Sequence, residues 1–259
     1  MNFIYSIFAA FSMFSALPAP QVPWEKEKIR YMLVCLPFVG VAIGAAEWLW
    51  AVLVDLLELG PGLRAAGFTL IPILLTGGIH LDGFMDTVDA LKSHASPEKK
   101  RAILKDPHVG AFAAIGLGCY LLAYFALWFD IGPVAFRFMI PMHVMSRSLS
   151  AVSGTLLPVR PGEGTLNFFR QAADKKVGIM AVLWVILSAA YLVAIDPLTG
   201  SVMALGAILT LFLVRRMAMK QFEGMSGDIA GFQLQVAELV MLGLLVLTLS
   251  IWRIIWRIA

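Results

Sequence analysis

Apolar runs of roughly 20 residues dominate this 259-residue chain, in which 60% of residues are hydrophobic and 14% are charged. A soluble domain carries about 25% charged residues. A run of about 20 apolar residues is long enough for a helix to cross the core of a bilayer, where backbone polar groups must be satisfied internally. The pattern therefore predicts an all-α polytopic membrane helix bundle, folded as a single transmembrane domain over residues 1–259.

About seven of these runs are long enough to be membrane helices. Ahead of them, residues 2–16 predict an interfacial or re-entrant amphipathic helix that stops before Pro18, because proline interrupts helices. The predicted membrane helices are 31–54, 66–90, 110–129, 133–154, 177–195, 201–215 and 231–251.

Lysine and arginine are distributed unequally among the connecting segments. With a cytoplasmic N-terminus, most of them lie at 26–30, 91–109, 155–176 and 216–230, all on the cytoplasmic side. Membrane proteins follow this bias. The last three segments are also the long polar loops, so we expect function at the cytoplasmic face. The segment 252–257 carries arginines on the opposite side and is expected to lie in the interface between membrane and water.

A net charge of only +3 gives no support for nucleic-acid binding.

Three aspartates, Asp82, Asp86 and Asp89, follow one of the apolar runs. On a helix this spacing places the carboxylates on one stripe, within about 60° of each other. Exposure to water at the helix end would explain Asp89 alone, but three clustered negative charges need an offset, for which Mg²⁺ with oxygen ligands is suited. The preceding Gly77–Gly78 pair would allow another backbone or a ligand to approach closely.

A second motif, GMSGDIAG, covers residues 224–231. Gly224, Gly227 and Gly231 surround Asp228, and small residues around a carboxylate leave the backbone open to a phosphate or a metal ion. Gly227 and Gly231 are also spaced for ordinary helix packing. Either reading places a fourth carboxylate near a helix start.

Charged residues inside predicted membrane helices need partners. Glu238 lies deep in the last predicted helix, and we expect Arg147 to be its partner. Ser146 adjoins that arginine and is a further candidate for binding substrate.

Other candidates lie near the aspartate stripe. Lys105 abuts the start of a membrane helix and is placed to meet a phosphate, with Asp106 positioned to orient it. His80 lies on a different helix face from the stripe, where it either completes a hydrogen bond or contacts substrate. The cations of 99–101 are expected to contact lipid headgroups.

Carboxylates for Mg²⁺ together with cations for phosphate define a phosphoryl-transfer site. Four dispersed histidines and two cysteines do not support a zinc site or Ser-His-Asp hydrolysis. An ion-coupled transporter is one alternative, but transport sites lie near the bilayer midplane, whereas these acids gather at one face. The second alternative is a different Mg²⁺-dependent membrane transferase, of the CDP-alcohol phosphotransferase or aromatic prenyltransferase type.

These segments together resemble the cobalamin synthase family, also called adenosylcobinamide-GDP ribazoletransferase. The matching pieces occur in the family's order and span nearly the whole chain. In one of them, the family usually has Ser-Arg where this chain has Pro107-His108. The pieces are LPAP (17–20), GGIHLDGFMDTVDAL (77–91), LKDPHVG (104–110), Ser146-Arg147 and GMSGDIAG (224–231).

The resemblance implies a late step of vitamin B12 biosynthesis in the bacterial inner membrane. Adenosylcobinamide-GDP and α-ribazole 5′-phosphate (or α-ribazole) would give adenosylcobalamin 5′-phosphate (or adenosylcobalamin) and GMP, with Mg²⁺ required. We assign Asp82, Asp86 and Asp228 to the metal, and Asp89 to the metal or to the role of catalytic base. The small-residue motifs are compatible with a homo-oligomer. The candidate substrate-binding residues are His80, Lys105, Asp106, Ser146, Arg147, Gly224, Gly227 and Glu238.

Overall fold

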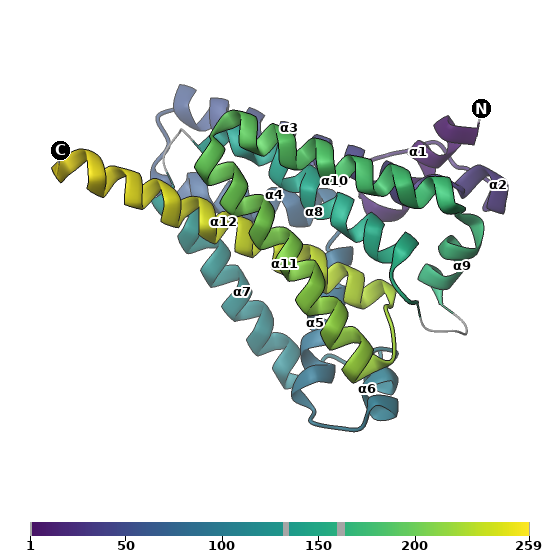
Figure 1. Ribbon diagram of the computed structural model, residues 1–259. Helices are drawn as coiled ribbons and strands as arrows, with labels where there is room; N and C mark the ends of the chain where they lie inside the picture. The colour runs from purple at the N-terminus through teal and green to yellow at the C-terminus, as the bar shows by residue number, and fades with distance from the viewer. Residues whose placement is uncertain (1, 132–134, 160–163, 259) are drawn as a thin grey trace.

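The computed structural model describes residues 2–131, 135–159 and 164–258. Over these residues the chain is a bundle of α-helices without a β-strand, which confirms the predicted fold class (Figure 1). The helices are α1 (Asn2–Phe14), α2 (Lys26–Ile29), α3 (Met32–Leu56), α4 (Pro61–Thr76), α5 (Ile79–Lys92), α6 (Pro97–Ile103), α7 (Ala111–Asp130), α8 (Phe136–Leu156), α9 (Thr165–Ala172), α10 (Lys175–Ile195), α11 (Pro197–Phe222) and α12 (Gly227–Ile258).

Five of the described helices, α3, α7, α10, α11 and α12, are long and apolar enough to cross a membrane. A sixth span results if α4 and α5 are taken together. The last helix, α12, runs on to Ile258, so the segment 252–257 continues that helix. The first, α1, has 13 residues and is the short apolar helix predicted at 2–16.

The predicted helix at 66–90 is wrong as a single element, because α4 and α5 meet at an angle of 95°. The break falls at Gly77 and Gly78, whose φ angles of 62° and 77° are left-handed. Glycine adopts this conformation without a steric penalty. A Cβ atom on Gly77 would come no closer than 3.8 Å to Ala16, and one on Gly78 would meet nothing within 4 Å, so the structure shows these glycines serving the turn, with no other backbone packed closely against them.

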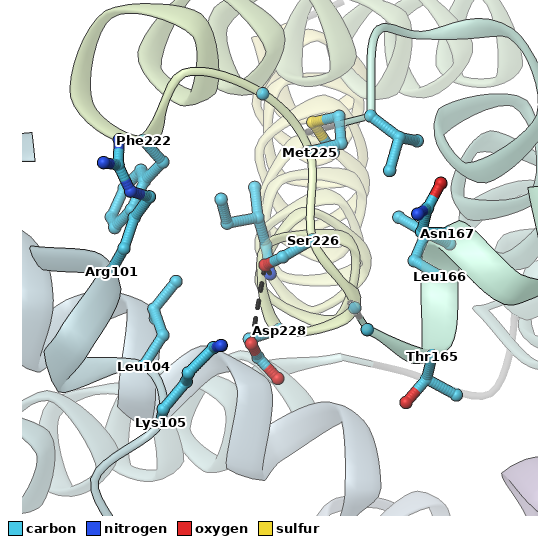
Figure 2. Close-up of a pocket in the computed structure, with 15 residues that line it drawn as sticks. Arg101, Leu104, Lys105, Thr165, Leu166, Asn167, Phe222, Met225, Ser226 and Asp228 are labelled. Atoms are coloured by element: carbon cyan, nitrogen blue, oxygen red, sulfur yellow. Dashed lines mark hydrogen bonds between the residues drawn. The ribbon is translucent and has the colours of Figure 1, made fainter. Parts of the chain in front are cut away.

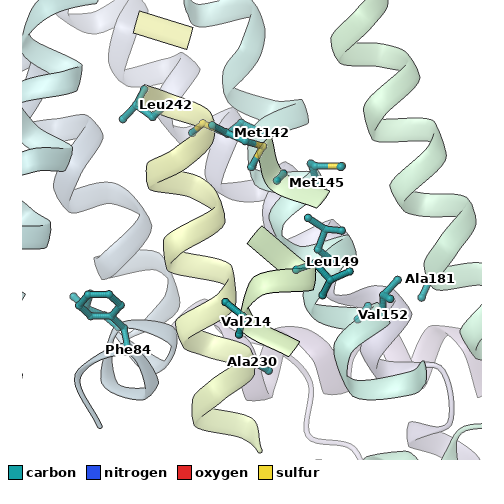
Figure 3. Packing of buried hydrophobic residues seen from close by; sticks show 14 of the residues in the cluster. Phe84, Met142, Met145, Leu149, Val152, Ala181, Val214, Ala230 and Leu242 are labelled. Atoms are coloured by element: carbon teal, nitrogen blue, oxygen red, sulfur yellow. The ribbon is translucent and has the colours of Figure 1, made fainter. Parts of the chain in front are cut away.

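The central helix is α8, which packs against α3, α10, α11 and α12. Its buried face includes Met142, Met145 and Leu149, and Figure 3 shows these side chains between the neighbouring helices. The predicted span at 133–154 corresponds to α8, with residues 133 and 134 outside the described part of the chain. The neighbouring helices shield α8 from lipid, so it tolerates buried polar residues. These polar residues explain why α8 is not among the five described helices that are apolar enough to cross a membrane.

Candidate active site

The acidic helix α5 and the start of α12 approach each other backbone to backbone. A Cβ atom on Gly83 would lie 2.8 Å from the Cα atom of Asp228, and one on Gly231 would lie 3.0 Å from the carbonyl oxygen of His80. Glycine at both positions therefore lets the two helices touch. Of the two readings of the 224–231 motif, Gly231 serves helix packing, whereas a Cβ on Gly227 would meet nothing within 4 Å.

This contact gathers the predicted carboxylates. Asp82, Asp89 and Asp228 all act electrostatically on Asp86, so the stripe of α5 and the acid of α12 form one group of negative charges. Asp228 also receives a hydrogen bond from the Ser226 hydroxyl, at 3.4 Å. The acidic residues named from the sequence are thus close enough to influence one another electrostatically.

The donor set of this acidic group suits Mg²⁺. Within the described chain, no three Asp, Glu, His or Cys side chains converge closely enough to hold a metal ion by themselves. Mg²⁺ is usually bound through one or two carboxylates together with substrate phosphates and water. The acidic group of α5 and α12 offers carboxylates of this kind.

Asp89 has an additional contact that the sequence did not indicate. The backbone N–H of Ala113 donates to Asp89 Oδ1 at 3.3 Å, near the first turn of α7. A Cβ atom on Gly110 would lie 2.1 Å from the same oxygen, so this glycine makes room for the carboxylate. Negative charge is favoured at a helix N-terminus, and this contact fixes Asp89 between α5 and α7.

A cavity of about 280 Å³ opens beside Asp228 where the three polar loops meet (Figure 2). The loops are joined there: the Met225 N–H donates to the Pro158 carbonyl at 2.9 Å, and Arg101 forms an ion pair with Glu223. The cavity is lined by Arg101, Leu104, Lys105, Val159, Gly164, Thr165, Leu166, Asn167, Phe222, Gly224, Met225, Ser226, Gly227, Asp228 and Ile229.

Of the predicted substrate-binding residues, Lys105, Gly224 and Gly227 line this cavity. The Lys105 side chain extends toward Asp228 from the opposite wall (Figure 2). The Gly224 backbone has a φ of 147°, a conformation that favours glycine. The cavity is therefore lined by cationic side chains, by a carboxylate and by glycine backbone that no side chain covers.

The expectation that the cations of 99–101 contact lipid headgroups is wrong for two of them. Arg101 lines the cavity, and Lys100 is buried with its ammonium group hydrogen-bonded to Gln221. The sequence held one signal for Arg101, which lies four residues before Lys105, the cation already assigned to phosphate; α6 itself ends at Ile103, before Lys105. Thr165, Asn167 and Ser226 were also missed, because nothing in their local pattern distinguishes them from ordinary loop residues.

A smaller cavity of about 160 Å³ shares part of its wall with the larger one. Asp82, Gly227 and Asp228 line it, and so does His80, one of the predicted substrate-binding residues. Its remaining lining is mainly apolar; it comes largely from α1, α3 and α9, with further residues of α5, α8 and α12. Those residues are Met13, Phe14, Leu33, Leu36, Ile79, Ser150, Thr165, Leu166, Phe169, Ala230 and Gly231.

Three predicted substrate-binding residues lie elsewhere, in a fully buried ionic network. Arg147 pairs with Glu238, as expected from sequence, and the Ser146 hydroxyl donates to the same carboxylate at 2.8 Å. His143 bridges Glu238 at 2.8 Å and Glu47 of α3 at 2.9 Å. The structure brings these residues together with each other, outside the linings of both cavities.

Asp106 faces solvent beside Lys105. Its carboxylate accepts hydrogen bonds from the backbone N–H of His108 at 3.0 Å and from that residue's ring at 2.6 Å. The backbone hydrogen bond in particular holds the pKa of the Asp106 carboxyl below its usual value. The observed partner of this acid is therefore His108, where Lys105 was expected.

Comparison with known proteins relates this site to one family. Residues 6–246 match the family described as cobalamin-5-phosphate synthase. An adenosylcobinamide-GDP ribazoletransferase of Lachnoclostridium phytofermentans is 37% identical over 241 residues, which cover 93% of this chain and 92% of that protein. A protein of the same name from Clostridium botulinum (strain Alaska E43) is 30% identical over 246 residues, covering 92% and 96% of the two chains. No solved structure matches this sequence.

Proposed function

This chain belongs to the cobalamin-5-phosphate synthase family, as an enzyme of the adenosylcobinamide-GDP ribazoletransferase type, and we propose that it uses the cavity between α6, α9, the end of α11 and the start of α12 for an Mg²⁺-dependent transfer. The observation that carries the proposal is the position of Asp228. This residue belongs to the acidic group of α5 and α12 and lines both cavities.

In the proposed reaction, a ribose hydroxyl of α-ribazole 5′-phosphate attacks the phosphorus nearer cobinamide. A new bond forms between the hydroxyl oxygen and this phosphorus. The bond from the same phosphorus to the bridging oxygen of the diphosphate breaks, and GMP leaves with the bridging oxygen. The hydroxyl proton passes to a base. The site therefore needs cations on the departing phosphate and an acceptor for the proton.

Two groups of residues would meet these needs: the cations that line the larger cavity and the acidic group of α5 and α12, which reaches the cavity at Asp228. Lys105 and Arg101 face the cavity and are placed to bind the diphosphate, because Arg and Lys are the usual phosphate ligands. Asp82, Asp86 and Asp228 would hold Mg²⁺, which neutralises charge on the diphosphate when it is bound. Asp89 is our candidate base, because it belongs to the same acidic group and α7 fixes its position.

The test is release of GMP by the purified protein in lipid nanodiscs, supplied with adenosylcobinamide-GDP, α-ribazole 5′-phosphate and Mg²⁺. We expect Asp82→Asn and Asp86→Asn to abolish release while the melting temperature is retained. Asp130→Asn, at the exposed end of α7, is the matched control and should behave as the unmodified protein. Near-normal turnover by Asp82→Asn and Asp86→Asn would contradict the metal assignment.

We place this site on the cytoplasmic face of the bacterial inner membrane, because lysine and arginine concentrate at that end of the bundle. The substitution His94→Cys, in a Cys119→Ser background, places a single exposed thiol on the protein and reports which side of the membrane the site faces. A membrane-impermeant maleimide should label it in inverted vesicles only. Labelling in right-side-out vesicles alone would reverse the orientation.

A further inference from the structure

We propose that the smaller cavity binds the aromatic base of the α-ribazole substrate, with His80 Nε2 hydrogen-bonded to the free ring nitrogen of that base. The inference rests on the proposed function and assigns one part of one substrate to one subsite. It also gives the N-terminal helix α1 a part in the site.

The first observation is an unpaired nitrogen. His80 is 5% exposed, and its Nε2 atom has no hydrogen-bond partner among the described residues. Leaving a buried polar group without a partner is unfavourable, because the group has lost its hydrogen bonds to water. A ligand that offers one acceptor or donor in the cavity would remove this cost.

The second observation is the shape and chemistry of the surrounding wall. Phe14 of α1 stacks on the His80 ring with centroids 5.9 Å apart and planes 17° apart, and Phe169 of α9 stands edge-on to Phe14. Leu33 and Leu36 of α3 complete the apolar side. An apolar cavity of about 150 Å³ accommodates a benzene ring, so a cavity of about 160 Å³ suits a small aromatic group.

Among the parts of the two substrates, the benzimidazole base matches this wall. It combines an apolar benzene ring with one free ring nitrogen, and the wall offers an apolar surface and one free imidazole nitrogen. Guanine carries several polar groups, each of which would need a partner in a mainly apolar cavity. The corrin ring is far too large for a space of about 160 Å³.

The third observation is connectivity between the two cavities. Gly227 and Asp228 line both, and so do Thr165 and Leu166. A base held in the smaller cavity would direct its ribose across this shared wall. The attacking hydroxyl would then reach the diphosphate bound near Lys105 in the larger cavity.

The experiment compares α-ribazole 5′-phosphate with an indole analogue, in which a C–H group replaces the free ring nitrogen. A site that pairs with a substrate nitrogen rejects an analogue lacking it. We expect the unmodified enzyme to prefer the natural substrate by about tenfold or more in kcat/KM, which corresponds to about 1.4 kcal/mol. His80→Leu should raise the KM for α-ribazole 5′-phosphate and lose the preference, because its side chain forms no hydrogen bond.

Two further variants separate binding from folding. His80→Gln retains a polar group near the position of Nε2 and should recover part of the preference. His94→Asn removes an exposed imidazole outside both cavities and should change neither kinetic constant; asparagine tolerates the φ of 52° at this position. Melting temperatures in the same nanodiscs identify any variant that fails to fold.

The outcomes distinguish this inference from the proposed function. If the unmodified protein releases no GMP from the natural pair of substrates, the proposed function fails. If GMP is released but folded His80→Leu keeps the preference for the natural base, only the base subsite is refuted. A rise in KM for adenosylcobinamide-GDP alone would also overturn it, since His80 would then face the other substrate.

Discussion

Gly83 of α5 lies directly against the backbone of Asp228, where a Cβ atom would come within 2.8 Å of the Asp228 Cα and carbonyl oxygen. The atoms in contact are backbone, so neither helix can relieve the overlap by rotating a side chain. The separation of the acidic helix from the fourth carboxylate is therefore set by the absence of one methyl group.

Gly83→Ala should push α5 away from α12 and lower kcat by about 10²-fold, because a displacement of about 1 Å at catalytic groups has effects of this size. GMP release measures the loss. Gly118→Ala on α7 is the matched control, since a Cβ atom there meets nothing within 4 Å. Full activity in Gly83→Ala would show that the helix separation is not critical.

Arg147→Met should destabilise the protein by about 3–5 kcal/mol, because it removes the guanidinium from the buried Glu238 carboxylate and leaves His143 as its remaining ion-pair partner. Unfolding in one fixed lipid and detergent mixture measures the change. The double variant with Glu238→Leu should lose less than the sum of the two single changes. A raised KM with unchanged stability would instead support direct substrate binding by Arg147.

Asp89→Asn and Asp89→Ala separate the two roles open to this residue. If Asp89 is the base, both variants should lose about 10²–10⁴-fold in kcat. The asparagine side chain can still accept the hydrogen bond from Ala113, so the melting temperature of Asp89→Asn should match that of the unmodified protein. Asp89→Ala loses this hydrogen bond and should melt at a lower temperature. Normal turnover in Asp89→Asn would restrict the residue to positioning α7.

Arg101→Gln should raise the KM for adenosylcobinamide-GDP, because the cavity loses a cation facing the diphosphate. About tenfold is expected for a charge-assisted contact of about 1.5 kcal/mol. Arg64→Gln provides a control, since this residue pairs with Asp55 outside both cavities. Loss of stability without a change in KM would mean that Arg101 serves only its ion pair with Glu223.

Much of the fold and of the acidic site was predictable because it depends on local pattern. Apolar length identifies a spanning helix whatever its neighbours are, and the spacing of Asp82, Asp86 and Asp89 places them on one face of any helix that contains them. The pairing of Arg147 with Glu238 was also predictable, because a charge inside a membrane bundle requires an opposite charge.

Features that depend on contact between distant segments were not predictable. The wall formed by Phe14 and Phe169 brings α1 together with α9, and apolar residues look alike in sequence whether they face lipid, a neighbouring helix or a substrate. The turn at Gly77 and Gly78 was misread because the same two glycines suit close packing and left-handed backbone equally well.

The central position of α8 has a consequence for how the chain is assembled in the membrane. Its Arg147 emerges from the ribosome well before Glu238, the carboxylate that neutralises it, which lies about 90 residues further along the chain on α12. Only Glu47, which contacts Arg147's neighbour His143, is already in place. The buried ionic network that joins α3, α8 and α12 can therefore form only after α12 has been made.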